Sequence, residues 1–201
     1  MDLAASSPNT RRRGAGLEDA ILDAAWETLQ ESGYGGFTFD AVATRAGTSR
    51  PVLYRRWPTR PELMLATIRH AGILKPVEMP DTGSVRDDAL VLLRRINEAR
   101  AGHSALLSVL LGEYFRETGS NYRELRSMIN PGRNGFQVII DRATERDEAP
   151  WPQLPPRVVD VAIDLFRVEL LMAQTAVPDE NIVSMVDDVW LPLLRTYGAP
   201  V

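Results

Sequence analysis

Residues 37–63, FTFDAVATRAGTSRPVLYRRWPTRPEL, contain two short helical segments on either side of a glycine turn. Thr38 can cap the first segment and Ser49 can cap the second. Gly47 begins the turn between them, and Pro51 falls in the first turn of the second segment, where its missing N–H costs little. A short helix, a glycine turn and a short basic helix together predict a helix-turn-helix.

Positive charge gathers in the second segment and around it. Residues 45–60 contain five arginines and no acidic residue, although the whole chain has a formal net charge of −4. On a helix, Leu53 and Trp57 share one side, which suits a core. The rest of the helix presents guanidinium groups, a phenol and small apolar groups, which can bind phosphates, guanine edges and thymine methyl groups. The candidate DNA contacts of this helix are Arg50, Pro51, Val52, Tyr54, Arg55 and Arg56. The alternative for the three arginines is a charged face that only water solvates.

A fourth helix begins with the capping box Thr59-x-x-Glu62. Thr38 and Thr59 are first of all caps, but the helix N-termini that they occupy can also meet phosphates.

The two parts of the chain differ in charge. Residues 1–75 contain ten basic and eight acidic residues, whereas residues 76–201 contain thirteen and nineteen. We therefore expect only the N-terminal part to meet a polyanion. Residues 1–15 form an expected disordered basic arm, in which Arg11–Arg13 are either a solvated tail or a minor-groove arm.

Helical periodicity continues along the chain, and no alternating strand pattern is present. We expect a DNA-binding domain over residues 16–74, a boundary around residues 75–83 that is rich in proline and glycine, and a helical domain over residues 84–201. The expected helices of the second domain span 85–101, 104–117, 120–148 with a break at 130–132, 157–176 and 179–197. The predicted fold class is therefore all-α.

Composition narrows the possible functions. The chain has no cysteine, so disulfides and cysteinate metal sites are excluded. It has no secretory signal and no apolar stretch long enough to span a bilayer, and we expect a cytoplasmic protein without membrane contact. The two histidines, His70 and His103, lie far apart in the sequence. No spacing typical of a metal, cofactor or catalytic site is present, so we expect no enzyme, no metal and no cofactor.

At the level of motifs, residues 17–70 resemble the DNA-binding domain of the TetR family of transcriptional regulators. The resemblance rests on the pattern Phe37-Thr38-Phe39-x-x-Val42-Ala43-x-x-Ala46-Gly47-x-Ser49-x-x-x-Leu53-Tyr54-x-x-Trp57-x-x-Arg60-x-x-Leu63. It implies a three-helix DNA-binding domain, a helical domain for ligand binding and dimerisation, and usually repression that a small molecule relieves.

Carried onto this chain, the resemblance implies the turn Gly47-Thr48-Ser49, the recognition helix Arg50–Trp57 and a phosphate contact by Tyr54. It adds Thr48, Ser49 and Arg60 to the candidate DNA contacts. The chain departs from the family pattern at Thr48, where the residue is usually apolar, at Arg60, where it is usually lysine, and at Arg56, where it is often His or Tyr. These departures bear on the operator sequence and leave the DNA-binding chemistry in place.

In the second domain, polar or aromatic residues on apolar helices are candidates for an effector pocket, although for each one taken alone a packed core residue is the favoured explanation. They are His103, Tyr114, Phe115, Met128, Phe136, Phe166 and Glu169. The last two helices are apolar over a wide arc, which predicts a four-helix interface between two copies; a large monomeric core is the alternative. The candidate interface residues are Phe166, Leu170, Ile182, Val186, Val189, Trp190 and Leu193.

The sequence thus predicts a homodimeric repressor that binds palindromic half-sites of double-stranded DNA and is released by an unknown hydrophobic or aromatic effector. The alternatives are a DNA-binding activator or architectural factor without an effector and, much less favoured, a helical enzyme.

Overall fold

The computed structural model describes residues 15–73, 75–122, 124–125, 134–146 and 154–198. These residues form helices and no strand, which confirms the all-α prediction. The chain divides into two compact units, Met1–Gly72 and Ile73–Val201, and each is described by itself. The predicted basic arm and the predicted helix break at residues 130–132 lie outside the described residues, apart from Ala15.

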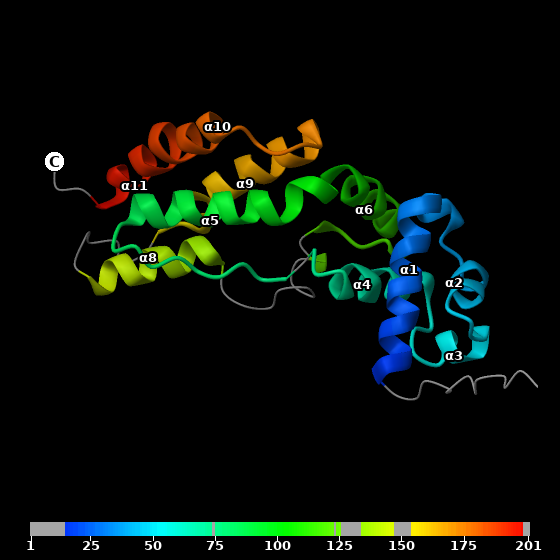
Figure 1. Ribbon diagram of the computed structural model, residues 1–201. Helices are drawn as coiled ribbons and strands as arrows, with labels where there is room; N and C mark the ends of the chain where they lie inside the picture. The colour runs from blue at the N-terminus through cyan, green and yellow to red at the C-terminus, as the bar shows by residue number, and fades with distance from the viewer. Residues whose placement is uncertain (1–14, 74, 123, 126–133, 147–153, 199–201) are drawn as a thin grey trace, which may run out of the picture. The chain divides into compact units, whose positions relative to one another are not determined.

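Unit 1 consists of α1 (Ala15–Gly36), α2 (Phe39–Arg45), α3 (Arg50–Tyr54) and α4 (Arg60–His70), with α2 and α4 packed on α1 (Figure 1). Its core contains the fully buried residues Ile21, Ala25, Leu29, Phe37, Val42, Leu53 and Leu63. Helix α1 is interrupted at Gly33, whose positive φ of 60° is a conformation that glycine adopts without strain.

Two predicted features of the third helix need correction. Its regular part ends at Tyr54 rather than Trp57, although a 2.8 Å bond from the Trp57 N–H to the Leu53 carbonyl adds one more helical turn. Pro58 explains the end, because a residue before proline is pushed out of the helical region. Ser49 occupies the N-cap position, but its side chain makes no capping hydrogen bond. By contrast, Thr38 and Thr59 accept bonds from the N–H groups of Ala41 and Glu62, as expected of caps.

Unit 2 consists of α5 (Val85–Arg100), η1 (Ala101–His103), α6 (Ser104–Thr118), α8 (Gly135–Glu145), α9 (Pro156–Ala173), α10 (Asp179–Ser184), η2 (Met185–Trp190) and α11 (Leu191–Gly198). Helix α5 lies between α8 on one side and α10 with η2 on the other (Figure 1). The core centres on Phe136 and Trp190, whose rings meet edge to face at 4.8 Å. The Trp190 indole N–H donates to the Val158 carbonyl at 3.1 Å, so the buried polar group has a partner.

The predicted single helix over 179–197 is interrupted by a π-helical segment, η2. Ile182, Val186, Trp190 and Leu194 follow one another at intervals of four and are all buried. In a regular α-helix such a series drifts around the surface, because four residues exceed one turn of 3.6. The wider π turn reduces this drift and keeps the four side chains on one face.

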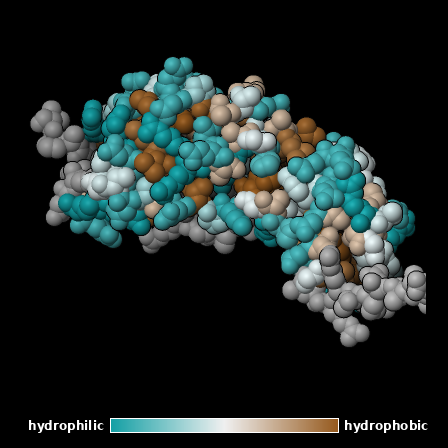
Figure 2. All heavy atoms as spheres, in the orientation of Figure 1, coloured by the Kyte–Doolittle hydropathy of each residue, from teal (hydrophilic) through white to brown (hydrophobic). Residues whose placement is uncertain are grey.

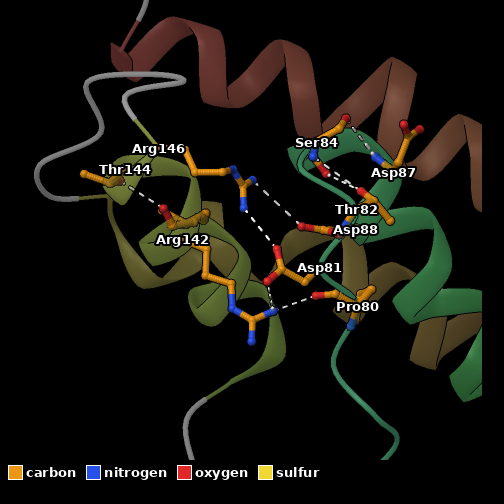
Figure 3. Close-up of polar contacts among 10 residues, drawn as sticks. Pro80, Asp81, Thr82, Ser84, Asp87, Asp88, Arg142, Thr144 and Arg146 are labelled. Atoms are coloured by element: carbon orange, nitrogen blue, oxygen red, sulfur yellow. Dashed lines mark hydrogen bonds and ion pairs between the residues drawn. The ribbon is translucent and has the colours of Figure 1, made fainter.

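A polar cluster fixes the segment that precedes α5 (Figure 3). The Asp88 side chain is fully buried and accepts a 2.6 Å bond from the Thr82 backbone N–H. Arg142 of α8 donates to the Pro80 carbonyl at 2.7 Å, and Arg146 lies 3.5 Å from a carboxylate oxygen of Asp81. The segment that the sequence predicts as a domain boundary is therefore tied to α5 and α8 within unit 2.

Candidate nucleic-acid interface

The predicted DNA contacts of unit 1 all retain solvent exposure. Seven are exposed, namely Thr38, Ser49, Arg50, Pro51, Tyr54, Arg55 and Thr59, and four are half-buried, namely Thr48, Val52, Arg56 and Arg60. Leu53 and Trp57, predicted as core residues of the same segment, are buried. The segment is thus anchored by one face and leaves the other open.

The turn before α3 requires its glycine. Gly47 has a φ of 61°, in the left-handed region that other residues rarely adopt. The Thr48 backbone N–H donates to the Ala43 carbonyl at 3.0 Å, which closes the turn on α2. This geometry sets the angle at which α3 leaves α2.

Tyr54 is held by an aromatic neighbour. Its ring stacks on that of Phe39 with centroids 4.1 Å apart and an interplanar angle of 22°. Tyr54 nevertheless remains 47% exposed, so the stack orients the ring without covering it. The positioning role of Phe39 was not predicted from the sequence. Its position, opposite Tyr54 across the turn, becomes apparent only when α2 and α3 are packed together.

The arginines of the segment fall into distinct environments. Both carboxylate oxygens of Asp40 accept hydrogen bonds from Arg50, whose side chain is still 54% exposed. Arg55 is exposed, and its side chain makes no hydrogen bond or ion pair with any residue that the structure describes. A guanidinium in the Arg55 environment can form a bidentate contact with a phosphate or a guanine without first breaking an ion pair.

Arg56 and Arg60 have partners inside unit 1. The Nε of Arg56 lies 3.6 Å from a carboxylate oxygen of Glu18, and its Nη1 is buried without a hydrogen-bond partner. The guanidinium of Arg60 lies 4.0 Å from the ring centroid of Tyr34, a cation–π contact. These contacts favour structural roles for both residues and leave Arg50, Tyr54 and Arg55 as the strongest candidates for DNA contacts.

A further ion pair lies elsewhere on the surface of unit 1. Arg45 hydrogen-bonds Glu31 of α1, and this bond lowers the pKa of Glu31 and raises that of Arg45. The pair joins α2 to α1 and involves none of the candidate DNA contacts.

The predicted effector residues of unit 2 do not form one cluster. Phe136 and Phe166 are fully buried in the main hydrophobic core, which supports the alternative of packed core residues. Tyr114 is buried and meets Phe115 edge to face at 5.8 Å, whereas Glu169 accepts a hydrogen bond from Asn181. His103 is half-buried in η1, and Met128 lies outside the described residues.

The predicted interface residues must be revised. Phe166, Leu170, Ile182, Val186 and Trp190 are buried in the core of their own unit, so their side chains are not available at the surface. The wide apolar arc that predicted an interface is largely explained by the packing of α9, α10 and η2 against one another and against α5 and α8. Val189 is 38% exposed and Leu193 is half-buried, so these two remain candidates.

Other exposed apolar residues extend this surface. Val161, Leu165, Val168 and Met172 follow one helical stripe of α9. Val161 is half-buried, whereas Leu165, Val168 and Met172 are 39%, 60% and 80% exposed. Tyr197 of α11, which continues the line of Val189 and Leu193, is 50% exposed. In the view of Figure 2, hydrophobic residues of unit 2 reach the surface as patches among hydrophilic ones.

Within the described part of the chain, no three His, Cys, Asp or Glu side chains are placed to hold a metal ion. None of the described helices is long and apolar enough to cross a membrane.

Comparison with known proteins matches both units. Residues 21–67 match the family model described as bacterial regulatory proteins, tetR family, and residues 79–189 match the model of a tetracyclin repressor-like C-terminal domain. An HTH-type transcriptional regulator of Mycobacterium tuberculosis (strain H37Rv) is 30% identical over 182 residues, which cover 90% of each chain. A protein of Mycobacteroides abscessus described as DNA-binding transcriptional repressor TetR is 30% identical over 186 residues, covering 91% of this chain and 96% of its own.

Solved structures support the fold. The crystal structure of TetR family transcription regulator SCO0332 is 24% identical, with a TM-score of 0.57 and coverage of 87% of this chain and 96% of its own. A putative TetR-family regulator of Mesorhizobium loti is 15% identical, with a TM-score of 0.60 and coverage of 94% and 100%.

Proposed function

This chain belongs to the TetR family of DNA-binding transcriptional regulators, and from this premise we propose that it is a homodimeric repressor released from its operator by a small molecule. The observation that carries the proposal is the surface of unit 1 on which Arg50, Tyr54 and Arg55 lie exposed. They sit on a segment anchored by buried Leu53 and Trp57.

This surface suits the major groove of DNA. The arginines offer guanidinium forks for guanine O6 and N7 or for phosphates, and the Tyr54 hydroxyl can donate to a phosphate oxygen. Pro51 and Val52 add small apolar groups that can touch a thymine methyl. Thr38 and Thr59 mark two helix N-termini whose free N–H groups favour phosphates.

Dimerisation is supported by the exposed apolar surface of unit 2. A contiguous exposed apolar patch is typical of an interaction site. The stripes on α9 and on η2 with α11 are neighbours, since α9 packs against η2. We propose that two copies associate through these stripes, whose residues are Val161, Leu165, Val168, Met172, Val189, Leu193 and Tyr197. One recognition segment reads few base pairs, and paired half-sites compensate for this.

Repression and release by an effector are the finer part of the proposal. The relative from Mycobacteroides abscessus is described as a repressor, and unit 2 matches a repressor-like C-terminal domain. An effector that binds better to a conformation unsuited to the operator would shift the population away from DNA. The effector is proposed to be hydrophobic or aromatic, because unit 2 is built from apolar helices.

The experiment is a fluorescence anisotropy titration of the full chain on duplexes taken from DNA beside its own gene. We expect one duplex to bind far better than a scrambled duplex of the same length, with affinity that falls as salt rises. If every duplex binds no better than the scrambled one, the proposed function is wrong. An operator that binds but is released by no small molecule in a metabolite screen would favour the activator or architectural factor instead.

A further inference from the structure

Arg100, at the end of α5, carries a charge that its surroundings leave uncompensated. Its Nε is shielded from solvent and has no hydrogen-bond partner among the residues that the structure describes. No carboxylate of the described residues acts on it, and the two side chains that affect its pKa are the phenol of Tyr122 and the guanidinium of Arg167. Burial lowers the pKa of Arg100, an effect that Tyr122 opposes and Arg167 reinforces. Arginine stays protonated in proteins even so, and Arg100 is therefore a half-buried cation whose Nε is shielded from solvent.

The other arginines of α5 all have hydrogen-bond partners, so the lack of one at the Nε of Arg100 among the described residues is exceptional within the helix. Arg86 donates two hydrogen bonds to the carboxylate of Asp187, and Arg94 donates two to that of Asp179, all at 2.6–2.8 Å. Arg95 donates to the Glu78 carbonyl at 2.7 Å. A buried charge without a partner is strongly unfavourable, whereas an anion that binds it removes much of that penalty.

A second cation lies close to Arg100. The Arg167 side chain of α9 is only 19% exposed, and its ion pair with Asp164 spans one turn of the same helix at 2.8 Å. The Asp164 side chain is 49% exposed, so solvent weakens its compensation of Arg167. Two arginines from different helices thus place positive charge in one region of unit 2.

Apolar residues of α6 lie next to this region, since α6 packs against both η1 and α9. Leu110 and Tyr114 are buried but stand outside the main hydrophobic core of the unit. The other apolar residues of the helix are only partly covered; Leu106, Leu107, Leu111 and Phe115 are half-buried. An apolar molecule that covered them would be stabilised by the hydrophobic effect.

We propose that Arg100 and Arg167 bind the oxyanion of a small molecule whose apolar body lies against α6. The proposal rests on the proposed function, because this molecule is the effector, and it defines the effector as a carboxylate or another oxyanion on an apolar body. Bidentate hydrogen bonds from guanidinium groups recognise such oxyanions.

The test uses the full chain without DNA and two matched probes, octanoate and octanamide, which differ in charge but hardly in size. Binding is followed by NMR through the side-chain Nε–H signal of Arg100, which burial protects from exchange with solvent. We expect octanoate to shift this signal in a saturable manner and octanamide to leave it unchanged. No response up to about 10 mM octanoate, enough to fill a site of millimolar affinity, overturns the proposal, as does an equal response to octanamide.

Variants of the two arginines test whether they form the oxyanion site. Arg100→Gln and Arg167→Gln should each bind octanoate about 10- to 100-fold more weakly, the range expected for losing a charged hydrogen bond. Arg95→Gln, on the same helix but already paired, should bind as the wild type does. Unchanged affinity in both Arg100→Gln and Arg167→Gln contradicts the assignment. If Arg100→Gln fails to fold, the affinity of Arg167→Gln and the Arg100 signal of the wild-type protein still test whether octanoate binds at this site.

A measurement without any ligand distinguishes this role from a structural one. Because the charge of Arg100 is uncompensated, Arg100→Met should keep or raise the melting temperature of the free protein. A clear fall in melting temperature would indicate a structural partner for Arg100 and contradict the proposal. If the wild-type protein binds its operator but does not bind octanoate, the proposed function stands and the anion site alone is overturned.

Discussion

At the scale of single residues, the arginines that look equivalent in the sequence have different partners. Arg55 is unpaired among the described residues, Arg50 is held by Asp40, Arg56 lies beside Glu18, and Arg60 stacks on Tyr34. Sequence spacing predicted which side of the segment is exposed, because that follows from helical periodicity. It could not predict these pairings, since they depend on how α1, α2 and α3 pack.

Replacing Arg55 by alanine removes the unpaired guanidinium. We expect operator binding to weaken by about 1–3 kcal/mol, with relaxed preference at one base pair if Arg55 contacts a guanine. Anisotropy titrations on single-base variants of the operator measure both effects. An equal loss on all sequences would identify a phosphate contact, and no loss on any sequence would remove Arg55 from the interface.

Replacing Asp40 by asparagine removes the acidic competitor for Arg50. Because the ion pair must break before Arg50 contacts DNA, Asp40→Asn should strengthen DNA binding about two- to fivefold, as expected for an exposed ion pair. Glu31→Gln is the matched control, since Glu31 pairs with Arg45 away from the candidate contacts. Weaker binding by Asp40→Asn would mean that the pair orients Arg50 for DNA rather than restraining it.

At the scale of elements, the short α3 is stable only through its anchors. Trp57 is 8% exposed and belongs to a small core, and Trp57→Ala should lower the free energy of unfolding by about 3–5 kcal/mol. Urea denaturation followed by circular dichroism measures this change. Pro51→Ala, at an exposed position of the same segment, is the control and should change stability little. Full stability of Trp57→Ala would contradict the anchoring role.

The segment before α5 depends on Asp88 in a comparable way. Asp88→Ala leaves the Thr82 N–H without its acceptor, and we expect a loss of about 1–3 kcal/mol of stability in unit 2. Asp87→Ala, at the neighbouring exposed position, should cost less. Thermal denaturation of the two variants compares them, and equal melting temperatures would show that the buried carboxylate contributes nothing.

Helix positions were largely predictable because amphipathic periodicity and caps are local signals. The places where the helices are interrupted could not be predicted from these signals. The π-helical segment at Met185–Trp190 and the end of α9 at Ala173, where Gln174 adopts a left-handed φ of 56°, have no counterpart in the amphipathic pattern of the sequence. In the same way, the sequence identified Phe166 and Trp190 as apolar but could not tell a contact within the chain from one between chains.

At the scale of the whole molecule, the proposed repressor consists of two copies joined through unit 2. Val168→Glu and Met172→Glu place charges in the exposed stripe of α9 and should convert a dimer into a monomer. Operator affinity should fall when the dimer is lost, because the two recognition segments would no longer bind the paired half-sites as one molecule. Sedimentation velocity measures the change, with Val109→Glu as the control, since Val109 is 57% exposed on α6. A variant that remains dimeric would place the interface elsewhere.

In the proposed dimer, two recognition segments together read one specific DNA sequence. The most direct measurement is the affinity and stoichiometry of the full chain on a duplex from beside its own gene, compared with a scrambled duplex at physiological salt. We predict two chains per specific site and binding at least about 1,000-fold tighter than to the scrambled duplex. Equal affinity for the two duplexes would contradict the account.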